Sequence, residues 1–270
     1  MGFFIPVEQN VRVYVEDLNP GDGLPIVFIH GWPVNHNMFE YQFNQLPKLG
    51  YRCIGIDLRG CGQSDRPWYG YSYDRISDDI SMVMESLGVE NVILVGHSMG
   101  GAVAIRYMAR HHGNRVKKLV LIGAAAPVFT RRPGFKYGMT REDIDTIIEN
   151  TYTNRPKMLE GFGDIFFSRY VTEGVRNWFN TLGLAASGHA TAMYAQSLRD
   201  EDLRSDLPAI NVPTGIFHGV LDKVCPFPLA EVMHAGIQGS ELIPFLSGGH
   251  GLFYTELEQF NHELVRFLAQ

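Results

Sequence analysis

Short apolar runs alternate with amphipathic stretches along the first half of the chain. Residues 11–15 alternate apolar and polar positions, which is typical of a half-exposed strand. Four further runs are apolar almost throughout, at residues 25–29, 51–56, 92–95 and 119–122. Continuous runs of this kind are expected for the buried strands of a parallel sheet whose two faces are covered by helices.

Stretches with helical spacing lie between these runs, at residues 37–49, 74–87 and 98–112. In the second of them the apolar side chains recur at helical intervals, and Gly88 follows where the helix would end. The order of strand, helix and strand predicts an α/β fold with a doubly wound sheet and right-handed crossovers.

The pattern changes near Pro127. Residues 128–206 contain no clear strand, but they hold helical stretches at 142–150 and 173–194 and many aromatic side chains. We interpret this segment as a helical cap that is inserted into the core. The alternative is a set of ordinary helices that pack on the sheet.

The α/β pattern resumes after the inserted segment. Strands are predicted at 212–218 and 241–245, with a helix at 228–235 between them. The last helix is predicted to begin at Thr255-Glu-Leu-Glu258, which matches a capping box. The domain organisation is therefore a core of residues 1–127 and 207–270 and a cap of residues 128–206.

Composition and charge exclude several classes of protein. The 270 residues are 45% hydrophobic and 19% charged, which is ordinary for a globular protein and unlike a disordered one. The 23 basic and 29 acidic side chains give a net charge of −6, so we expect neither nucleic acid nor a membrane surface as a partner. No apolar run has the length of a membrane span, and the N-terminus lacks the basic start of a signal peptide. We expect a cytoplasmic protein and leave open whether it forms a homo-oligomer.

The three cysteines, Cys53, Cys61 and Cys225, are too few for a disulfide framework and fit a reducing compartment. None of them has the spacing of a zinc site, so we expect no structural metal.

The most informative stretch is Gly96-His-Ser-Met-Gly100, which follows a buried strand and precedes a helix. It matches G-x-S-x-G, in which a sharp turn lifts a serine clear of the backbone so that a base can activate it. The pentapeptide alone is common enough to arise by chance. Its context of strand, motif and helix favours Ser98 as a nucleophile, with the helix N-terminus favouring the negative charge that develops beside it.

One of the ten histidines lies where a base is needed. His250 follows the strand at 241–245 and precedes the last helix, so it lies at the same sheet edge as Ser98. Asp222 follows the strand at 212–218 and can orient that histidine. The order Ser98, Asp222, His250 is the order that this architecture uses.

The other candidates have simpler structural interpretations, as turn residues, buried side chains or solvated faces. These are His30 and His218 in His-Gly turns, His97 beside the serine, His111, His112 and His262 on predicted helices, His36, His189 and His234 outside any motif, and Asp200, Asp202 and Asp206 near the end of the cap.

Acyl transfer needs two donors for the tetrahedral oxyanion. The backbone N–H groups of Met99 and Trp32 are the candidates, because each lies in the turn after a strand end, whereas Pro33 has no N–H. Pro33 also favours an extended backbone at Trp32. One hypothesis is that this directs the Trp32 carbonyl toward a bound water or hydrogen peroxide; the alternative is an ordinary turn proline.

Taken together, these motifs resemble those of the α/β-hydrolase superfamily. The resemblance rests on His30-Gly-Trp-Pro33, Asp57-Leu-Arg-Gly-Cys-Gly-Gln-Ser-Asp65, Gly96-His-Ser-Met-Gly-Gly101, His218-Gly-Val-Leu-Asp222 and Gly249-His-Gly251. It is strongest toward the branch of cofactor-free haloperoxidases, perhydrolases and small-ester carboxylesterases. His97 departs from the aromatic residue often found before the serine in the haloperoxidases, and Cys61 departs from the larger residue usual in its turn.

The resemblance implies a mostly parallel eight-stranded sheet with helices on both faces, an inserted helical cap and no cofactor. It implies a Ser98–Asp222–His250 triad and an oxyanion hole at Trp32 and Met99. It also suggests that Trp32, Phe129, Phe162 and Val224 bind the substrate.

A serine nucleophile excludes the epoxide hydrolases and haloalkane dehalogenases that resemble this sequence, because those enzymes need an aspartate at that position. We predict a serine hydrolase that cleaves small to medium carboxylic esters through an acyl-enzyme, with peracid formation as a side activity. The predicted partner is a small-molecule ester. A C–C bond hydrolase, a lactonase and a non-enzymatic receptor of the same fold remain as alternatives.

Overall fold

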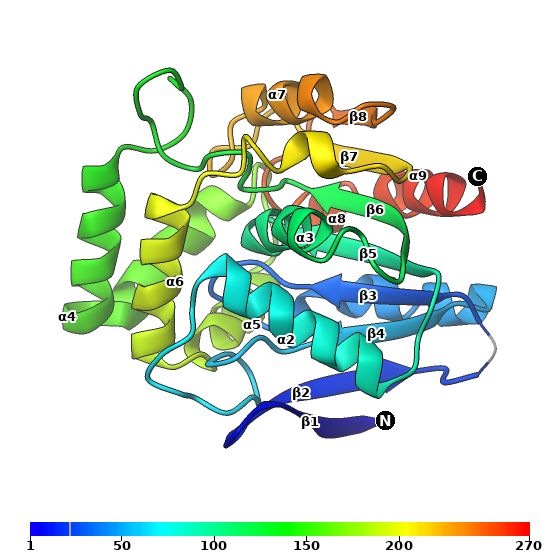
Figure 1. Ribbon diagram of the computed structural model, residues 1–270. Coiled ribbons are helices and arrows are strands. Elements are labelled where there is room, and N and C mark those ends of the chain that lie inside the picture. The colour runs from blue at the N-terminus through cyan, green and yellow to red at the C-terminus, as the bar shows by residue number, and fades with distance from the viewer. Residues whose placement is uncertain (22) are drawn as a thin grey trace.

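A single twisted sheet of eight strands runs through the computed structural model, which describes residues 1–21 and 23–270 (Figure 1). The strands are β1 (Gly2–Glu8), β2 (Val11–Leu18), β3 (Pro25–Ile29), β4 (Arg52–Ile56), β5 (Val92–His97), β6 (Val116–Ile122), β7 (Thr214–Gly219) and β8 (Glu241–Phe245). Their spatial order is β1-β2-β4-β3-β5-β6-β7-β8. Both pairings of β2 are antiparallel and the other pairings are parallel, so the predicted fold class is confirmed.

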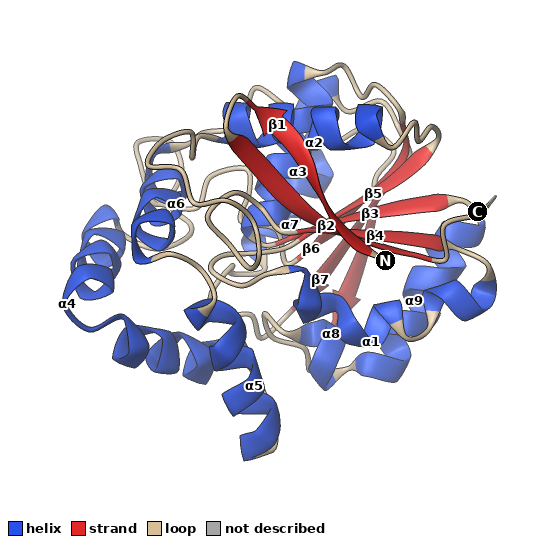
Figure 2. Ribbon diagram, turned by 90° about the horizontal axis from the view of Figure 1, so that it is seen from below, coloured by secondary structure: helices blue, strands red, loops and turns tan. Residues whose placement is uncertain are grey.

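Helices cover both faces of this sheet (Figure 2). One face carries α2 (Tyr73–Ser86), α3 (Met99–Arg110) and α7 (Pro228–Gly236), whose buried side chains join one hydrophobic cluster. The other face carries α1 (Glu40–Phe43), α8 (Leu252–Thr255) and α9 (Leu257–Ala269). The aromatic side chains of α8 and α9 form the second cluster against it. No helix of the described residues is both long enough and apolar enough to cross a membrane.

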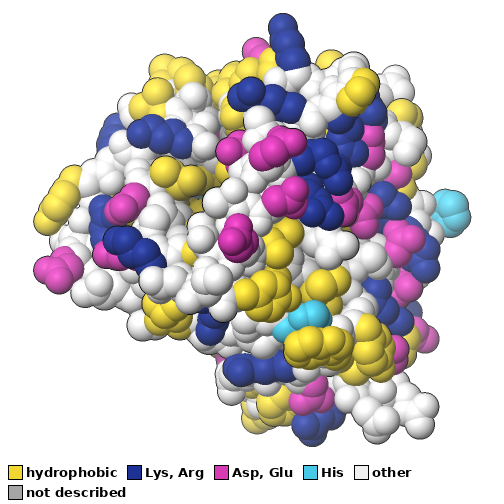
Figure 3. All heavy atoms as spheres, turned by 90° about the vertical axis from the view of Figure 1, so that its left-hand side faces the viewer, with side chains coloured by type: hydrophobic (Ala, Val, Ile, Leu, Met, Phe, Trp, Pro, Cys, Tyr) yellow, Lys and Arg dark blue, Asp and Glu magenta, His cyan; other side chains and the backbone are white. Residues whose placement is uncertain are grey.

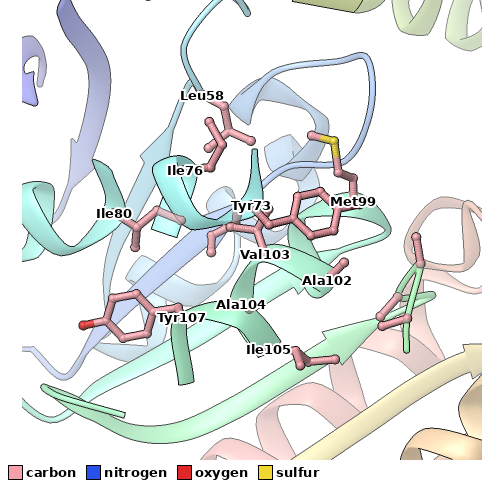
Figure 4. Close-up of a cluster of buried hydrophobic side chains, with 14 of the residues drawn as sticks. Leu58, Tyr73, Ile76, Ile80, Met99, Ala102, Val103, Ala104, Ile105 and Tyr107 are labelled. Atoms are coloured by element: carbon pink, nitrogen blue, oxygen red, sulfur yellow. The ribbon is translucent and has the colours of Figure 1, made fainter. Parts of the chain in front are cut away.

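The helix that follows Ser98 is the most deeply buried of these elements. Ala102, Val103, Ala104 and Ile105 of α3 have no exposed surface, and the α2 side chains pack beside them (Figure 4). Helix α2 has an apolar face at helical spacing, and the Ser72 hydroxyl caps its first turn by accepting from the Arg75 N–H. This packing fixes the direction in which α3 leaves the turn at Ser98.

Three helices lie together beyond one end of the sheet (Figures 1 and 2). They are α4 (Arg141–Phe166), α5 (Glu173–Leu184) and α6 (Gly188–Asp200), and all fall within the segment predicted as a cap. Helix α4 is kinked at Asn154, where φ is −153° and ψ is 65°, two residues before Pro156. A proline inside a helix removes one hydrogen bond and clashes with the preceding turn, so the kink has a local cause.

The outer side of this helical segment carries basic and acidic side chains close together, with hydrophobic ones between them (Figure 3). Arg199 of α6 forms an ion pair with Asp145 of α4, and Arg141 pairs with Asp200 at 2.6 Å. These ion pairs connect α4 and α6, which also pack more extensively against each other than either packs against α5.

Several predicted elements differ from the observed ones. Strand β1 was not expected; its apolar run contains Pro6, which lacks a backbone N–H and is tolerated in a strand at the edge of a sheet. The predicted helix at 37–49 is wrong: Pro47 cannot continue a helix, and the segment forms two 3₁₀ turns, His36–Phe39 and Leu46–Leu49, around the single turn of α1. The predicted helix at 142–150 is the first part of α4.

The long helix predicted at 173–194 is two helices. Ser187 begins α6 by accepting a hydrogen bond from the Ala190 N–H, which the periodicity did not reveal. The predicted capping box is also wrong, because Thr255 ends α8, and α9 starts at Leu257 after Glu256, whose side chain forms no cap. The Thr255 hydroxyl instead donates to the Gly251 carbonyl, one helical turn earlier in the chain.

Candidate active site

Ser98 occupies a strained turn between β5 and α3. Its φ of 53° and ψ of −121° lie where residues other than glycine are rare, so the surrounding contacts must enforce this conformation. The Ser98 N–H donates to the Ile122 carbonyl at 2.9 Å, and the Ser98 carbonyl accepts from Ala125 N–H at 3.0 Å. A backbone held in this way presents the hydroxyl at the end of the strand.

The two glycines of the motif allow this turn to form. A Cβ at Gly96 would lie 2.4 Å from the Gly100 carbonyl oxygen, and a Cβ at Gly100 would lie 2.3 Å from the Ile29 carbonyl oxygen. Neither distance is compatible with a side chain, so both positions need glycine because other backbones pass close by.

Asp222 and His250 form a fully buried pair. The Nδ1–H of His250 donates to Asp222 Oδ2 over 2.8 Å, and neither side chain has exposed surface. The second carboxylate oxygen, Asp222 Oδ1, accepts from the backbone N–H groups of Val224 and Cys225, each at 2.8 Å. These bonds fix the carboxylate, so that it in turn fixes the imidazole tautomer with the proton on Nδ1 and the lone pair on Nε2.

The structure brings this pair to the same place as Ser98. Gly123 lies against the pair, because a Cβ at this position would be 3.4 Å from both Asp222 Oδ2 and His250 Nδ1. The preceding residue, Ile122, accepts a hydrogen bond from the Ser98 N–H through its carbonyl, so the pair and the serine lie close together. His250 Nε2 is buried and has no hydrogen-bond partner among the described residues, so it is not yet bonded to the serine hydroxyl. Such bonds are often long until substrate binds.

The two expected oxyanion donors, the backbone N–H groups of Trp32 and Met99, also lie beside Ser98. Within the described part of the chain, the N–H groups of Trp32 and Met99 donate to no backbone or side-chain acceptor. The loop that carries Trp32 touches the nucleophile turn, because a Cβ at Gly31 would be 3.0 Å from Ser98 Cβ. Both donors are therefore available next to the serine.

An apolar cavity with a volume of about 40 Å³ opens at Ser98. It is lined by Trp32, Ser98, Phe129, Met139, Ile144, Ile147, Phe162, Ile165, Ala195, Leu198 and Val224. The four side chains expected to bind substrate are all in this lining. Apart from Phe162, the lining residues of α4 and α6 were not predicted, because an amphipathic pattern does not show which partner a helix faces.

Trp32 connects this cavity to the helical segment. Its indole N–H donates to the Thr191 carbonyl of α6 at 2.8 Å, and its ring meets the edge of Phe162 from α4 at a centroid distance of 5.1 Å. The wall of the cavity and the candidate oxyanion hole therefore share Trp32, which is held by contacts to α4 and α6.

Two buried histidines shape the neighbouring loops. His30 accepts from the Leu58 N–H through Nε2 at 3.0 Å and donates from Nδ1 to the Gly31 carbonyl at 2.8 Å. Burial lowers the pKa of His30 to about 4, so the ring is neutral and acts as a loop support, as the His-Gly pair indicated. His36, which matched no motif, donates from Nδ1 to Asp57 at 2.6 Å and ties a second loop to the segment after β4.

The three cysteines are buried and free. Burial, and then the negative charge of Asp222, raise the pKa of the Cys225 thiol well above its ordinary value, so the thiol stays protonated. Among residues 1–21 and 23–270, no three histidine, cysteine, aspartate or glutamate side chains lie together in a way that could hold a metal ion.

A family model described as "alpha/beta hydrolase fold" matches residues 25–257 of the chain. Among its relatives, the AB hydrolase superfamily protein YisY of Bacillus subtilis is 54% identical over 99% of both chains. A bifunctional esterase/perhydrolase of Acinetobacter calcoaceticus is 29% identical over 98% of this chain and 99% of that protein.

Two solved structures are similar over their whole length. The esterase EaEST from Exiguobacterium antarcticum has 50% sequence identity and a TM-score of 0.97, and all of both chains is covered. A bromoperoxidase from Bacillus anthracis has 33% identity and a TM-score of 0.96, again over all of both chains.

Proposed function

Because the chain belongs to the α/β-hydrolase family and is a hydrolase like its relatives, we propose that it cleaves small to medium carboxylic esters through an acyl-enzyme at Ser98. The observation that carries this proposal is the buried 2.8 Å bond from His250 to Asp222, placed beside a serine in a strained turn. That bond leaves the Nε2 lone pair of the imidazole as the base.

The reaction follows from this arrangement. His250 Nε2 takes the hydroxyl proton as Ser98 Oγ bonds to the ester carbonyl carbon, and the Trp32 and Met99 N–H groups stabilise the oxyanion. Collapse of the intermediate breaks the bond to the alcohol, which receives the proton from His250. Water then attacks the acyl-enzyme by the same steps, releasing the acid and restoring Ser98.

The cavity supports an uncharged and short acyl group. Ser98 is its polar side chain, and the other lining residues are apolar. Its volume of about 40 Å³ accommodates little more than a few water molecules. A longer acyl chain would require the side chains of α4 and α6 to move, so turnover should decline from acetate to octanoate esters. A lactone is a cyclic ester and can be tested in the same panel.

Turnover of p-nitrophenyl acetate tests the proposal. The Ser98→Ala variant should lose roughly 10⁴- to 10⁶-fold in kcat. Ser86→Ala, at an exposed serine in the last turn of α2, is the matched control and should be unchanged. A loss below tenfold for Ser98→Ala would exclude Ser98 as the nucleophile, and a wild-type protein without turnover would favour a receptor.

Perhydrolysis is a second candidate activity, favoured by the similarity to an esterase/perhydrolase and a bromoperoxidase. In this reaction hydrogen peroxide replaces water, its oxygen bonds to the acyl carbon, and Ser98 and a peracid are released. The hypothesis for Pro33 can be tested by the ratio of peracid formation to hydrolysis. A ratio that falls in Pro33→Leu supports a role for Pro33, and an unchanged ratio contradicts it.

A further inference from the structure

His97 packs against the base, His250, although it was expected to have only a structural role. It is the last residue of β5, precedes Ser98 directly and is 1% exposed. Its ring centroid lies 4.6 Å from that of His250, 5.0 Å from that of Phe253 and 5.8 Å from that of Phe166. His97 does not line the cavity at Ser98 and is therefore not placed to touch substrate.

One hydrogen bond joins His97 to the base. Its Nε2 lies 3.1 Å from the backbone carbonyl oxygen of His250. A carbonyl oxygen only accepts, so Nε2 carries the proton, and in the neutral ring Nδ1 holds the lone pair. Burial, and then the nearby His250, lower the pKa of His97 well below its ordinary value, so the ring stays neutral.

The other ring nitrogen has no partner. His97 Nδ1 is buried without a hydrogen bond among the described residues, and a Cβ at Gly31 would lie only 2.7 Å from it. A buried acceptor without a partner is unfavourable. A phenyl ring in the same aromatic surroundings would avoid that cost. The imidazole therefore differs from a phenyl ring in one useful respect, the Nε2–H bond to His250.

The backbone of His250 lies in a glycine-rich loop, whose Gly248 carbonyl accepts from the Leu221 N–H at 2.9 Å. The sequence there is Gly248-Gly-His-Gly251, and glycine backbones restrict a loop less than other residues do. Two further hydrogen bonds join this loop to the C-terminal end of α4 and the residues after it. The Gly251 N–H donates to the Phe166 carbonyl at 2.9 Å, and the Ser168 hydroxyl donates to the Ser247 carbonyl at 3.1 Å. The bond from His97 comes instead from β5, a central strand of the sheet.

We propose that His97 is a positioning residue, whose Nε2–H fixes the backbone of His250 and so directs the imidazole toward Ser98. This inference rests on the proposed function, in which His250 is the base. A loss of the His97 bond should lower kcat, because His250 acts as the base in both the formation and the hydrolysis of the acyl-enzyme. If both steps slow together, kcat falls while KM remains nearly unchanged.

Three substitutions test this role. His97→Gln places an amide N–H near the position of Nε2, His97→Asn places one a carbon shorter, and His97→Phe has no donor. With p-nitrophenyl acetate, we expect the glutamine variant within about threefold of the wild-type kcat, and the asparagine and phenylalanine variants lower by about tenfold or more, with KM changed by less than about twofold. Titration with a fluorophosphonate counts the reactive serines in each preparation.

Thermal unfolding separates positioning from packing. His97→Phe should unfold within a few degrees of the wild type and still be slow. A wild-type kcat in both His97→Phe and His97→Asn would overturn the inference, and so would an equal loss in all three variants that follows their loss of stability. If instead the wild type shows no turnover that depends on Ser98, the proposed function itself is contradicted, before any variant of His97 is compared.

Discussion

His250 Nδ1 and Asp222 Oδ2 lie 2.8 Å apart, and both side chains are completely buried. The carboxylate reaches this position because two backbone N–H groups hold its other oxygen. The bond determines which nitrogen of the imidazole carries the proton, and therefore whether the ring can act as a base toward the serine.

The first prediction concerns this bond. Asp222→Asn keeps the size of the side chain but replaces an oxygen by an N–H₂ donor, which favours the imidazole tautomer with its proton on Nε2. We expect kcat for p-nitrophenyl acetate to fall by about 10⁴-fold. A far-ultraviolet circular dichroism spectrum like that of the wild type would show that the loss is chemical, whereas an active variant would exclude Asp222 as the orienting acid.

A second prediction concerns the cavity. Phe162→Ala removes a ring that lines it and packs on Trp32, which opens space at its wall. Each methylene that becomes accommodated contributes about 0.8 kcal/mol, so the ratio of kcat/KM for hexanoate to that for acetate should rise by about tenfold or more. Phe135→Ala is the control, because Phe135 is buried but lies outside the cavity lining. An equal change of the ratio in both variants would contradict the assigned acyl site.

A third prediction follows from the neutral state of His30. Its pKa is lowered by burial to about 4 from an ordinary value of 6.5. The folded state therefore binds fewer protons than the unfolded state between these values, and stability is present above pH 6.5 and is lost as the pH falls toward 4. The loss attributable to this one ring is roughly 3 kcal/mol.

Denaturant unfolding at several pH values tests this effect. His30→Gln retains a donor and an acceptor, so its stability should depend less on pH over that interval than the stability of the wild type. His262→Gln, at a histidine whose side chain is 76% exposed, should follow the wild type. If the free energy of unfolding changes equally with pH in all three proteins, His30 does not contribute to the pH dependence of stability.

A fourth prediction concerns the C-terminal helix. Lys118 of β6 is buried, and its ammonium group donates to the Phe267 carbonyl at 3.1 Å and the Leu268 carbonyl at 2.8 Å. Lys118→Met leaves these carbonyls without that donor and should lower the free energy of unfolding by about 1–3 kcal/mol. Esterase activity at room temperature should be retained, because α9 lies on the sheet away from the cavity.

The neighbouring lysine provides the control for that experiment. Lys117→Met changes an exposed side chain on the same strand, so its urea midpoint should remain at the wild-type value. A Lys118→Met protein as stable as the wild type would show that the capping of α9 contributes little.

The sheet and the chemistry at its edge could be predicted from the sequence because they depend on local patterns. The apolar runs marked the parallel strands, and G-x-S-x-G between a strand and a helix marked the turn at Ser98. The folding of the chain then brings Asp222 and His250 beside that turn, as the strand order implied. The roles assigned to these residues remain predictions that the experiments above address.

Other features depend on contacts that no local pattern records. The cavity lining from α4 and α6 depends on which face each of these helices turns inward, and no local pattern marked Ile144 and Leu198 as lining residues. The role inferred for His97 needs a carbonyl that is 153 positions away in the chain. The pairing of His36 with Asp57 joins two loops in the same way.

Covalent labelling identifies the nucleophile of the protein directly. The protein is treated with a fluorophosphonate, digested, and the modified residue is identified by mass spectrometry, in parallel with Ser98→Ala and Ser86→Ala. We expect a single label on Ser98, absent from Ser98→Ala and unchanged in Ser86→Ala, with loss of ester turnover in proportion to labelling. A label on any other residue, or full turnover after Ser98 is modified, would contradict the assignment of Ser98 as the nucleophile.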